Sequence, residues 1–251
     1  MNADVAGVIL AGGKGRRIKA RGINKAVFTL AGRPMINYTL ELLNKVGFKD
    51  NKIIIVVGFA KESIINFLGN KYVYAEQKQR LGTAHALRCA LTKIPSTINH
   101  IFVCHADDTA FYPAKVMKEL IASHLNNKAE LTFLTVEMNK PNIARVLRDK
   151  KGNVLGIIEQ QNLKPQEKAI KEINCGCYCF SHKFLNRFLP KVKKNPLSGE
   201  YYLTELIEIG IKYKTKINSF KMDNEDYFQG INTREQLDDA ERKMKKSKLY
   251  D

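Results

Sequence analysis

The sequence has little of what marks a membrane protein or a disulfide-stabilised one. No apolar run in its 251 residues reaches the roughly 18 to 20 residues that a membrane-spanning helix needs, and the N-terminus lacks the basic-then-apolar pattern of a secretion signal. Five cysteines, an odd number in a chain of this length, argue against a disulfide framework. We therefore expect a soluble cytoplasmic protein without a membrane partner.

Acidic residues are also scarce. The chain has 25 Asp and Glu against 42 Lys and Arg, and its formal charge of +17 is enough to attract polyanions over a distance. A nucleic-acid-binding module is the alternative that this charge allows, but the sequence has no nucleic-acid-binding motif with interleaved aromatic residues. The cations are spread along the chain, apart from a cluster at Lys243, Lys245, Lys246 and Lys248. We expect a lysine-rich solvated surface and no specific nucleic-acid partner.

Three of the five cysteines, Cys175, Cys177 and Cys179, alternate along the chain. In a β-strand this spacing places all three sulfur atoms on one face. A metal cluster is conceivable there, but no CxxC spacing or neighbouring histidine supports it. We expect these residues to act as small buried apolar side chains.

The most unusual stretch runs from residue 5 to residue 25. Its apolar start predicts a buried strand that leads directly into Ala11-Gly12-Gly13-Lys14-Gly15. Five further cations follow, at Arg16, Arg17, Lys19, Arg21 and Lys25. Glycines let backbone N–H groups approach a phosphate closely, and cations neutralise its charge. The alternative is an ordinary glycine turn beside a solvated basic face, but so many glycines and cations together favour a site for a nucleotide polyphosphate.

This stretch fits neither of the two common glycine motifs. A P-loop needs glycines five positions apart followed by Lys-Ser or Lys-Thr, and the dinucleotide fingerprint needs a glycine where Ile18 stands. The stretch instead resembles the LAxGxGxR signature of sugar-phosphate nucleotidyltransferases, which is followed by a downstream lysine. The resemblance implies that Arg17 and Lys25 are catalytic. It also implies that the nucleotide is bound by Leu10, Ala11, Gly12, Gly13, Lys14 and Gly15.

The order of predicted elements favours an α/β fold. Up to residue 125, strands over 5–10, 52–57, 72–74 and 100–104 alternate with helices over 35–46, 64–68 and 83–93. Beyond it, strands over 130–137, 145–148 and 154–158 are joined by tight turns, which indicates a mixed or antiparallel extension. We expect a mostly parallel, doubly wound mixed sheet that is Rossmann-like, as in nucleotide-diphospho-sugar transferases. It would form a single domain over 1–251, with a nucleotide-binding half (1–125), a sugar-binding half (126–232) and a C-terminal helix (233–251).

A polar segment after the third predicted strand strengthens the resemblance. Residues 77–83 fit the family's QxxxLGT motif, in which the glutamine and the backbone of the Gly-Thr pair read the edge of the base. Here these residues are Gln77, Gly82 and Thr83. The alternative is that Gln77 is a surface amide and Thr83 a helix cap.

Two carboxylates follow the strand over 100–104, in His105-Ala106-Asp107-Asp108. Open α/β sheets bind ligands at the carboxyl ends of their strands, and carboxylate oxygens suit Mg²⁺ that bridges phosphates. The family usually has Gly-Asp here, so the resemblance makes Asp107 a metal ligand, with Asp108 as an alternative. Gly230-Ile231-Asn232-Thr233-Arg234 matches the family's GVNxR, which implies Asn232 as the second metal ligand.

The later motifs concern the acceptor. Residues 158–159 and 172–176 resemble the family's VE and EINxG segments, and residues 198–205 match a GEYYLTD-like motif. This last motif is similar to one in the uridylyltransferase domain of bifunctional enzymes that make UDP-N-acetylglucosamine. The resemblance implies that the sugar contacts Ala144, Glu159, Asn174, Tyr202 and Thr204. Carboxylate and amide groups suit this task because each offers paired hydrogen-bonding sites to adjacent hydroxyls.

The chain also departs from the family pattern. The family's Pro-Lys is Asn24-Lys25, its GYGR segment ends here in Ala144-Arg145 after Asn142-Ile143, and a lysine common after the sugar glutamate is Gln161. There is no hexapeptide repeat, so we expect no β-helix and no acetyltransferase activity. These departures concern the sugar and its phosphate more than the nucleotide.

The resemblance implies a Mg²⁺-dependent enzyme that makes a UDP-sugar and pyrophosphate from UTP and a sugar 1-phosphate, with N-acetylglucosamine 1-phosphate as the preferred acceptor. Alternatives are glucose 1-phosphate or another phosphorylated alcohol, and dTTP or CTP as the nucleotide. A non-catalytic regulatory subunit is a further alternative, although such proteins typically lose the loop arginine or the metal carboxylate, and Arg17 and Asp107 are present. The sequence leaves the oligomeric state open.

Overall fold

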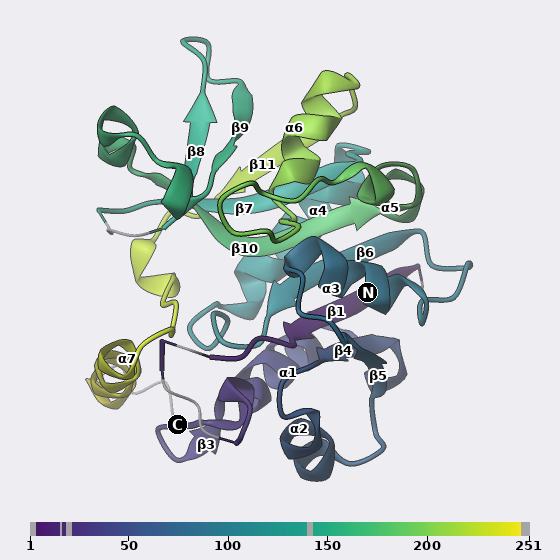
Figure 1. Ribbon diagram of the computed structural model, residues 1–251, viewed down its shortest axis with the longest axis vertical. Helices are drawn as coiled ribbons and strands as arrows, with labels where there is room; N and C mark the ends of the chain where they lie inside the picture. Colours follow the sequence, from purple (N-terminus) through teal and green to yellow (C-terminus); the bar gives the residue numbers. More distant parts are fainter. Residues whose placement is uncertain (1–3, 16, 19–21, 140–142, 247–251) are drawn as a thin grey trace.

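The computed structural model describes residues 4–15, 17–18, 22–139 and 143–246 (Figure 1). Five residues that the sequence analysis names lie outside these ranges: Arg16, Lys19, Arg21, Asn142 and Lys248. None of the described helices is both long enough and apolar enough to cross a membrane.

One nine-stranded sheet runs through the described part of the chain, with a spine in the order β11-β7-β10-β6-β1-β4-β5. Adjacent strands are parallel in the run β6-β1-β4-β5, and β11 is parallel to β7. In contrast, β10 is antiparallel to both β6 and β7. The bounds are β1 (Val5–Ala11), β4 (Ile53–Val57), β5 (Val73–Glu76), β6 (His100–His105), β7 (Leu131–Glu137), β10 (Glu172–Ser181) and β11 (Ile217–Lys221). The hairpin of β8 (Arg145–Arg148) and β9 (Val154–Ile158) adds to β10, and β2 (Thr29–Leu30) pairs with β3 (Arg33–Pro34) in a separate ribbon. The expected mostly parallel mixed sheet is confirmed.

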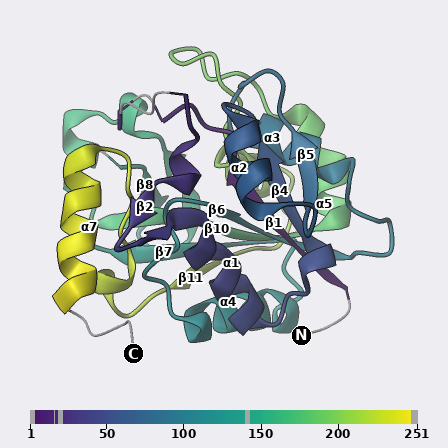
Figure 2. The same ribbon diagram turned by 90° about the horizontal axis from the view of Figure 1, so that it is seen from below.

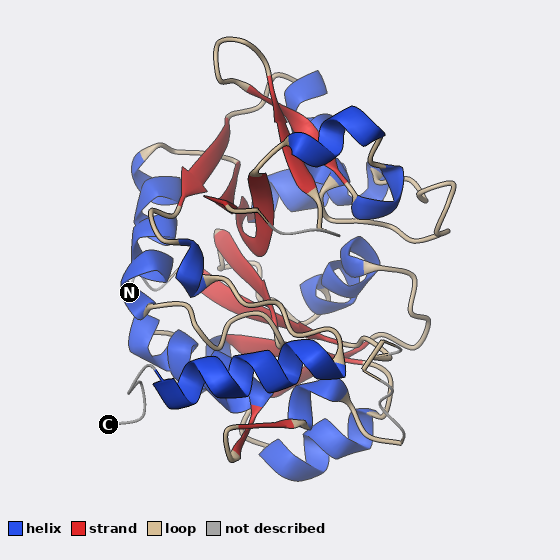
Figure 3. Ribbon diagram, turned by 90° about the vertical axis from the view of Figure 1, so that its left-hand side faces the viewer, coloured by secondary structure: helices blue, strands red, loops and turns tan. Residues whose placement is uncertain are grey.

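Both faces of the sheet are covered, which explains why the central strands are apolar throughout. In β1, Val5, Ile9 and Ala11 belong to one core cluster, whereas Val8 and Leu10 belong to the other, as the two-residue period of a strand requires. Helices lie on the two sides of the strands in Figure 3, and α1 and α4 lie across the sheet from α3 and α5 in Figure 2. The helix bounds are α1 (Met35–Val46), α2 (Lys61–Leu68), α3 (Thr83–Leu91), α4 (Ala114–Asn126), α5 (His182–Phe188), α6 (Glu205–Lys212) and α7 (Arg234–Lys246).

A third, smaller cluster holds the C-terminal helix α7 on the body of the protein. Leu237, Ala240 and Met244 of α7 are buried against residues that include Leu30 and Phe111. Since Ile231 belongs to the same cluster, the packing of α7 also fixes the segment that carries Asn232.

The alternating cysteines behave as expected. Cys175, Cys177 and Cys179 are buried in one core cluster, and all three are free thiols. Burial raises the pKa of each thiol, which keeps it protonated and unreactive. Their prediction as small apolar residues is confirmed.

The sequence analysis missed the helices α4, α5 and α6 and the strand β11. Between β1 and β2, Lys25–Val27 forms a 3-10 turn, η1. The turn begins at Asn24, whose side-chain oxygen accepts a hydrogen bond from the Ala26 N–H (2.9 Å). An N-cap of this kind starts a helical turn because it satisfies a backbone donor that has no partner within the turn.

Candidate active site

A cavity of about 530 Å³ opens at the carboxyl ends of β1 and β6. Apart from Asp108, the alternative metal ligand, it gathers every residue that the sequence analysis predicts for the nucleotide, the catalysis and the metal: residues 10–15, Arg17, Lys25, Gln77, Gly82, Thr83, Asp107 and Asn232. A second cavity of about 560 Å³, between α1 and α7, contains none of them. The carboxyl edge of parallel strands is where open α/β sheets place their ligands, so the first cavity is the candidate active site.

The glycine loop needs its glycines for two different reasons. A Cβ on Gly12 would lie 2.7 Å from Oε1 of Gln77, so only a glycine leaves room for the buried glutamine. Gly15 adopts the left-handed conformation at φ 59°, which glycine favours. The side chains of Lys14 and Arg17 are exposed at the cavity. Neither makes a hydrogen bond or an ion pair within the described residues.

Lys25 is positioned by its neighbour Asn24. The buried side chain of Asn24 donates two hydrogen bonds of 2.8 Å, one to the Ala11 carbonyl at the end of β1 and one to the Phe59 carbonyl. These bonds hold η1 against the glycine loop and direct Lys25 into the cavity. Asn24 replaces the family's proline, and its role as an anchor was not predicted from the sequence.

The Lys25 ammonium group makes three contacts with oxygen atoms. It pairs with the Asp107 carboxylate and donates hydrogen bonds to the Ile231 carbonyl (2.8 Å) and to Asn232 Oδ1 (3.1 Å). The two predicted metal ligands therefore face one position, which a cationic group fills. Asn232 is held in place from α7, because Gln236 Oε1 accepts hydrogen bonds from the N–H groups of Asn232 (2.7 Å) and Thr233 (3.2 Å).

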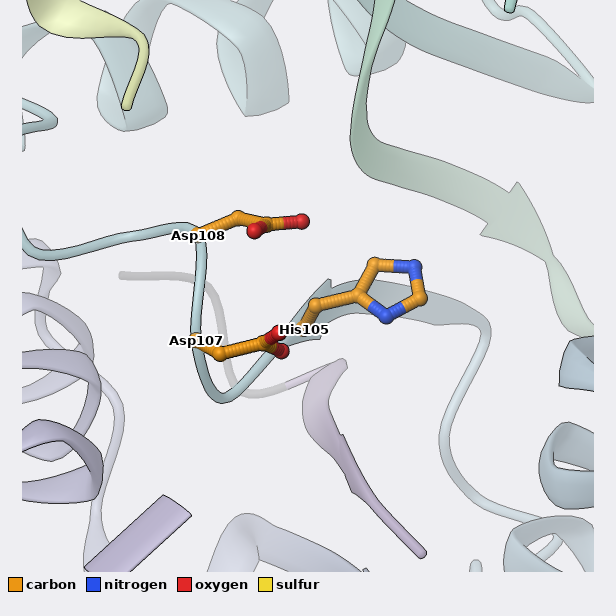
Figure 4. Close-up of side chains that lie close together, drawn as sticks. All are labelled: His105, Asp107 and Asp108. Atoms are coloured by element: carbon orange, nitrogen blue, oxygen red, sulfur yellow. The ribbon is translucent and has the colours of Figure 1, made fainter. Parts of the chain in front are cut away.

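Asp107 belongs to a compact group of possible metal ligands. His105, Asp107 and Asp108 each offer one ligand atom, and these atoms lie within 4.8 Å of one another, at the end of β6 and in the turn after it (Figure 4). Burial opposes ionisation of Asp107, but the nearby Lys25 and His105 outweigh it and lower the pKa of the carboxyl. Asp107 is thus an anion at neutral pH, and it shares its cavity with Asn232, whose side chain offers a second hard oxygen. This donor set fits Mg²⁺.

Gln77 and Thr83 are tied into the protein more firmly than the sequence suggested. The Gln77 side-chain nitrogen donates to the Gly82 carbonyl (2.9 Å) and lies 3.1 Å from Nδ1 of His85. Gly82 has φ 100°, and a Cβ there would lie 2.5 Å from the Tyr201 carbonyl oxygen. The Thr83 hydroxyl accepts a hydrogen bond from the Leu203 N–H (2.9 Å). The QxxxLGT segment is therefore held by the motif at residues 198–205.

The residues predicted for the sugar do not line this cavity. They form hydrogen-bonded pairs with each other or with neighbours: Thr204 donates to Glu159 (2.6 Å), Asn174 to Tyr178 (2.6 Å), and Gln161 to Tyr202 (3.2 Å). The fifth, Ala144, accepts a hydrogen bond from the Asn174 N–H through its carbonyl (3.4 Å). We call Glu159, Asn174, Tyr202 and Thr204 the second cluster. Burial raises the pKa of Glu159.

His105 joins the two regions. It lines the cavity, and its ring lies close to Gly176 of β10. A Cβ added to Gly176 would be 3.0 Å from Cδ2 of His105. Gly176 is only two residues from Asn174 of the second cluster. Sequence reasoning missed His105, and it also missed Arg80 and Glu200, which line the cavity. The only sequence signal for His105 was its place at the end of a predicted strand.

Comparison with known proteins identifies the class. The chain belongs to the family described as the MobA-like NTP transferase domain, which matches residues 7–164. It is a nucleotidyltransferase-family protein with a mixed α/β fold, as its motifs indicated.

The curated relatives are more specific. The chain is 35% identical over 249 residues to the bifunctional protein GlmU of Pelotomaculum thermopropionicum, covering 99% of this chain and 54% of the relative. The GlmU of a Geobacillus species is 36% identical over 239 residues, covering 95% of this chain and 51% of the relative. The GlmU of Desulfotalea psychrophila is 33% identical over 240 residues, covering 95% of this chain and 70% of the relative. The chain thus spans about half the length of most of these relatives, and the resemblance to a sugar-phosphate nucleotidyltransferase is confirmed.

A solved structure supports the fold. A glucose-1-phosphate thymidylyltransferase from Bacillus anthracis, in complex with sucrose, superposes with a TM-score of 0.77 at 19% identity, covering 95% of this chain and 94% of that one.

Proposed function

We propose that this protein makes a UDP-sugar and pyrophosphate from UTP and a sugar 1-phosphate, with N-acetylglucosamine 1-phosphate as the preferred acceptor. The observation that carries the proposal is the cavity that brings the glycine loop, Arg17 and Lys25 together with Asp107 and Asn232. The choice of UTP and of the sugar is supported by the GlmU relatives and by the motif at residues 198–205.

In this reaction a phosphate oxygen of the sugar 1-phosphate attacks the α-phosphorus of UTP in line. A new P–O bond forms, and the bond to the leaving pyrophosphate breaks. The acceptor phosphate is already a nucleophile, so no general base is required. The protein therefore acts mainly by aligning the two substrates and by stabilising the charge on the phosphates.

The residues of the cavity have distinct tasks. The backbone N–H groups of residues 11–15 approach the triphosphate, and Arg17 and Lys25 neutralise its charge. Asp107 and Asn232 would hold Mg²⁺, which when bound would neutralise charge on the phosphates of both substrates. Gln77 fixes Gly82 and Thr83 at the edge of the base, and the second cluster with Ala144 binds the hydroxyls of the sugar.

This assignment divides the chain into the parts that the sequence suggested. Residues 1–125 provide the glycine loop, Gln77 and Asp107, and residues 126–232 provide the second cluster and Asn232. The part from residue 233 onward contains the C-terminal helix α7 (Arg234–Lys246). We propose that these parts make up one catalytic domain.

The proposal is tested by a pyrophosphate-release screen. UTP, dTTP, CTP and GTP are each combined with a panel of sugar 1-phosphates and with phosphorylated alcohols, and Asp107→Asn serves as the matched inactive control. We expect the highest kcat/KM for UTP with N-acetylglucosamine 1-phosphate. A higher value for CTP with a phosphorylated alcohol, or for dTTP with glucose 1-phosphate, would replace this assignment. UTP binding without pyrophosphate release from any pair would indicate a regulatory subunit.

A further inference from the structure

The Lys25 ammonium group occupies the position that the proposed function assigns to the metal ion. Its three acceptors are the Asp107 carboxylate, the Ile231 carbonyl and Asn232 Oδ1. An ammonium group has three N–H donors, so these contacts use its full hydrogen-bonding capacity. The side chain is well enclosed, with 13% of it exposed, and Asp107 is 15% exposed.

A magnesium ion bound by the same residues cannot coexist with this arrangement. Mg²⁺ needs oxygen ligands at about 2.0 to 2.1 Å in octahedral geometry, and it would lie between the carboxylate and the amide oxygen where Nζ now lies. Two cations this close in a poorly solvated position would also repel each other strongly. Either the lysine or the metal ion can fill the position, but not both.

The other cavity cations are arranged differently. Lys14, Arg17 and Arg80 line the cavity, but within the described part of the chain none forms an ion pair with Asp107. The backbone at Lys25 is fixed by the hydrogen bonds of Asn24, whereas its side chain has four rotatable carbon–carbon bonds. The ammonium group can therefore move while its turn stays in place.

We propose that Lys25 is an internal substitute for the metal ion. In the free protein it neutralises Asp107 and occupies the metal position, and when UTP enters it moves to the phosphates and leaves that position to the metal. The metal ion and the nucleotide then bind together, and the metal alone binds weakly, because it must first displace Lys25. This inference rests on the proposed function, since it uses the same two metal ligands.

The test measures Mn²⁺ binding to the free protein, without nucleotide, by electron paramagnetic resonance. In most molecules of the free protein the Lys25 ammonium group competes with Mn²⁺ for the same position. We therefore expect Lys25→Met to bind Mn²⁺ about tenfold or more tightly than the wild type does. Lys14→Met is the matched control, because it removes the same charge from the same cavity without touching Asp107. We expect it to change the affinity by less than about threefold, since it acts only through a solvent-screened charge.

A second variant guards against loss of fold. Lys25→Gln removes the charge but keeps a hydrogen-bond donor for Asp107, and it should also bind Mn²⁺ more tightly than the wild type. The thermal midpoint of both Lys25 variants should rise more on addition of Mn²⁺ than that of the wild type. Equal tightening in the Lys14 and Lys25 variants, or no tightening in either Lys25 variant, overturns the proposal.

The failure of this inference can be told apart from failure of the proposed function. If Asp107→Asn abolishes Mn²⁺ binding and pyrophosphate release but the Lys25 variants do not bind Mn²⁺ more tightly, only the role of Lys25 as a substitute is wrong. If Asp107→Asn changes neither Mn²⁺ binding nor activity, the metal assignment itself is wrong, and this inference falls with it.

Discussion

The exposed cations of the nucleotide cavity and the side chains of the second cluster differ in how much of their bonding capacity is used within the protein. At the cavity, Lys14, Arg17 and Arg80 make no ion pair within the described residues, so their charge is available to a ligand. In the second cluster, Glu159 and Thr204 are hydrogen-bonded to each other at 2.6 Å. The cavity is therefore arranged for a polyanion, whereas the second cluster is arranged in advance by its own hydrogen bonds.

This difference predicts how substitutions should act in the two regions. A cation aimed at charge that develops during the reaction contributes mainly to the rate. A neutral hydrogen bond to a sugar hydroxyl contributes a smaller amount, typically about 0.5 to 1.5 kcal/mol, to binding. We expect large effects on kcat from the cavity and modest effects on acceptor KM from the second cluster.

The largest effect is expected from two cations of the cavity, Arg17 of the glycine-rich stretch and Lys25 of η1. Arg17→Ala and Lys25→Ala should each lower the rate by about 10² to 10³, because each removes a preorganised positive charge from the phosphates. Lys78→Ala is the control, since this exposed lysine is close in sequence to Gln77 but does not line the cavity. Retention of more than about half the activity in both variants would show that the loop is not the phosphate site.

The next effect concerns Asp107. Asp107→Asn should lower turnover by about 10² or more, because a neutral amide is a weaker ligand for Mg²⁺. Asp108→Asn is the matched comparison, since both carboxylates belong to the same compact group. Turnover should be measured for both variants across a Mg²⁺ titration. A larger loss in Asp108→Asn than in Asp107→Asn would transfer the metal assignment to Asp108.

Much of the cavity could be predicted because its signals are local in the sequence. Glycines and cations are concentrated in one stretch, and strands buried on both faces are apolar along their length, which makes them easy to recognise. Where the pattern is weak the prediction failed: β11 is only partly buried and α5 has seven residues, so neither shows a clear period.

Contacts between distant residues could not be predicted at all. Lys25 is 82 positions from Asp107 and 207 from Asn232, and no spacing rule connects them. The same holds for the bond between Thr204 and Glu159, which are 45 positions apart. The sequence could name these residues through a resemblance, but only the fold shows that Lys25 takes the position expected for a metal ion.

Gln77 links the two kinds of region, because it lines the cavity and its side-chain nitrogen also contacts Gly82 and His85 within the protein. Gln77→Ala should reduce the preference for UTP over CTP by about 1 to 3 kcal/mol, since it removes a group that fixes the edge of the base pocket. The measurement is kcat/KM for both nucleotides with the wild type and the variant. An unchanged ratio would show that Gln77 does not contribute to recognition of the base.

The smallest effect is expected from Glu159, and it depends on pH. Burial raises the pKa of this carboxyl in the folded protein, so above the folded pKa the native state contains a charged group that would be better solvated in the unfolded chain. As the pH falls through the folded pKa, the native state takes up the proton and the penalty disappears. Below the ordinary glutamate pKa both states are protonated and no difference remains.

Glu159→Gln removes this charge and keeps an oxygen that can accept the hydrogen bond from Thr204. The variant should therefore unfold a few degrees above the wild type at neutral pH, and the gain should shrink towards about pH 4. Glu225→Gln, at an exposed glutamate, controls for the change in total charge. The acceptor KM should rise by less than about tenfold, because a neutral amide still hydrogen-bonds a hydroxyl. A gain in thermal midpoint that is equal at neutral pH and at about pH 4 would mean that burial of the charge is not its cause. A loss of kcat comparable to that of Arg17→Ala would place Glu159 among the groups that act on the phosphates.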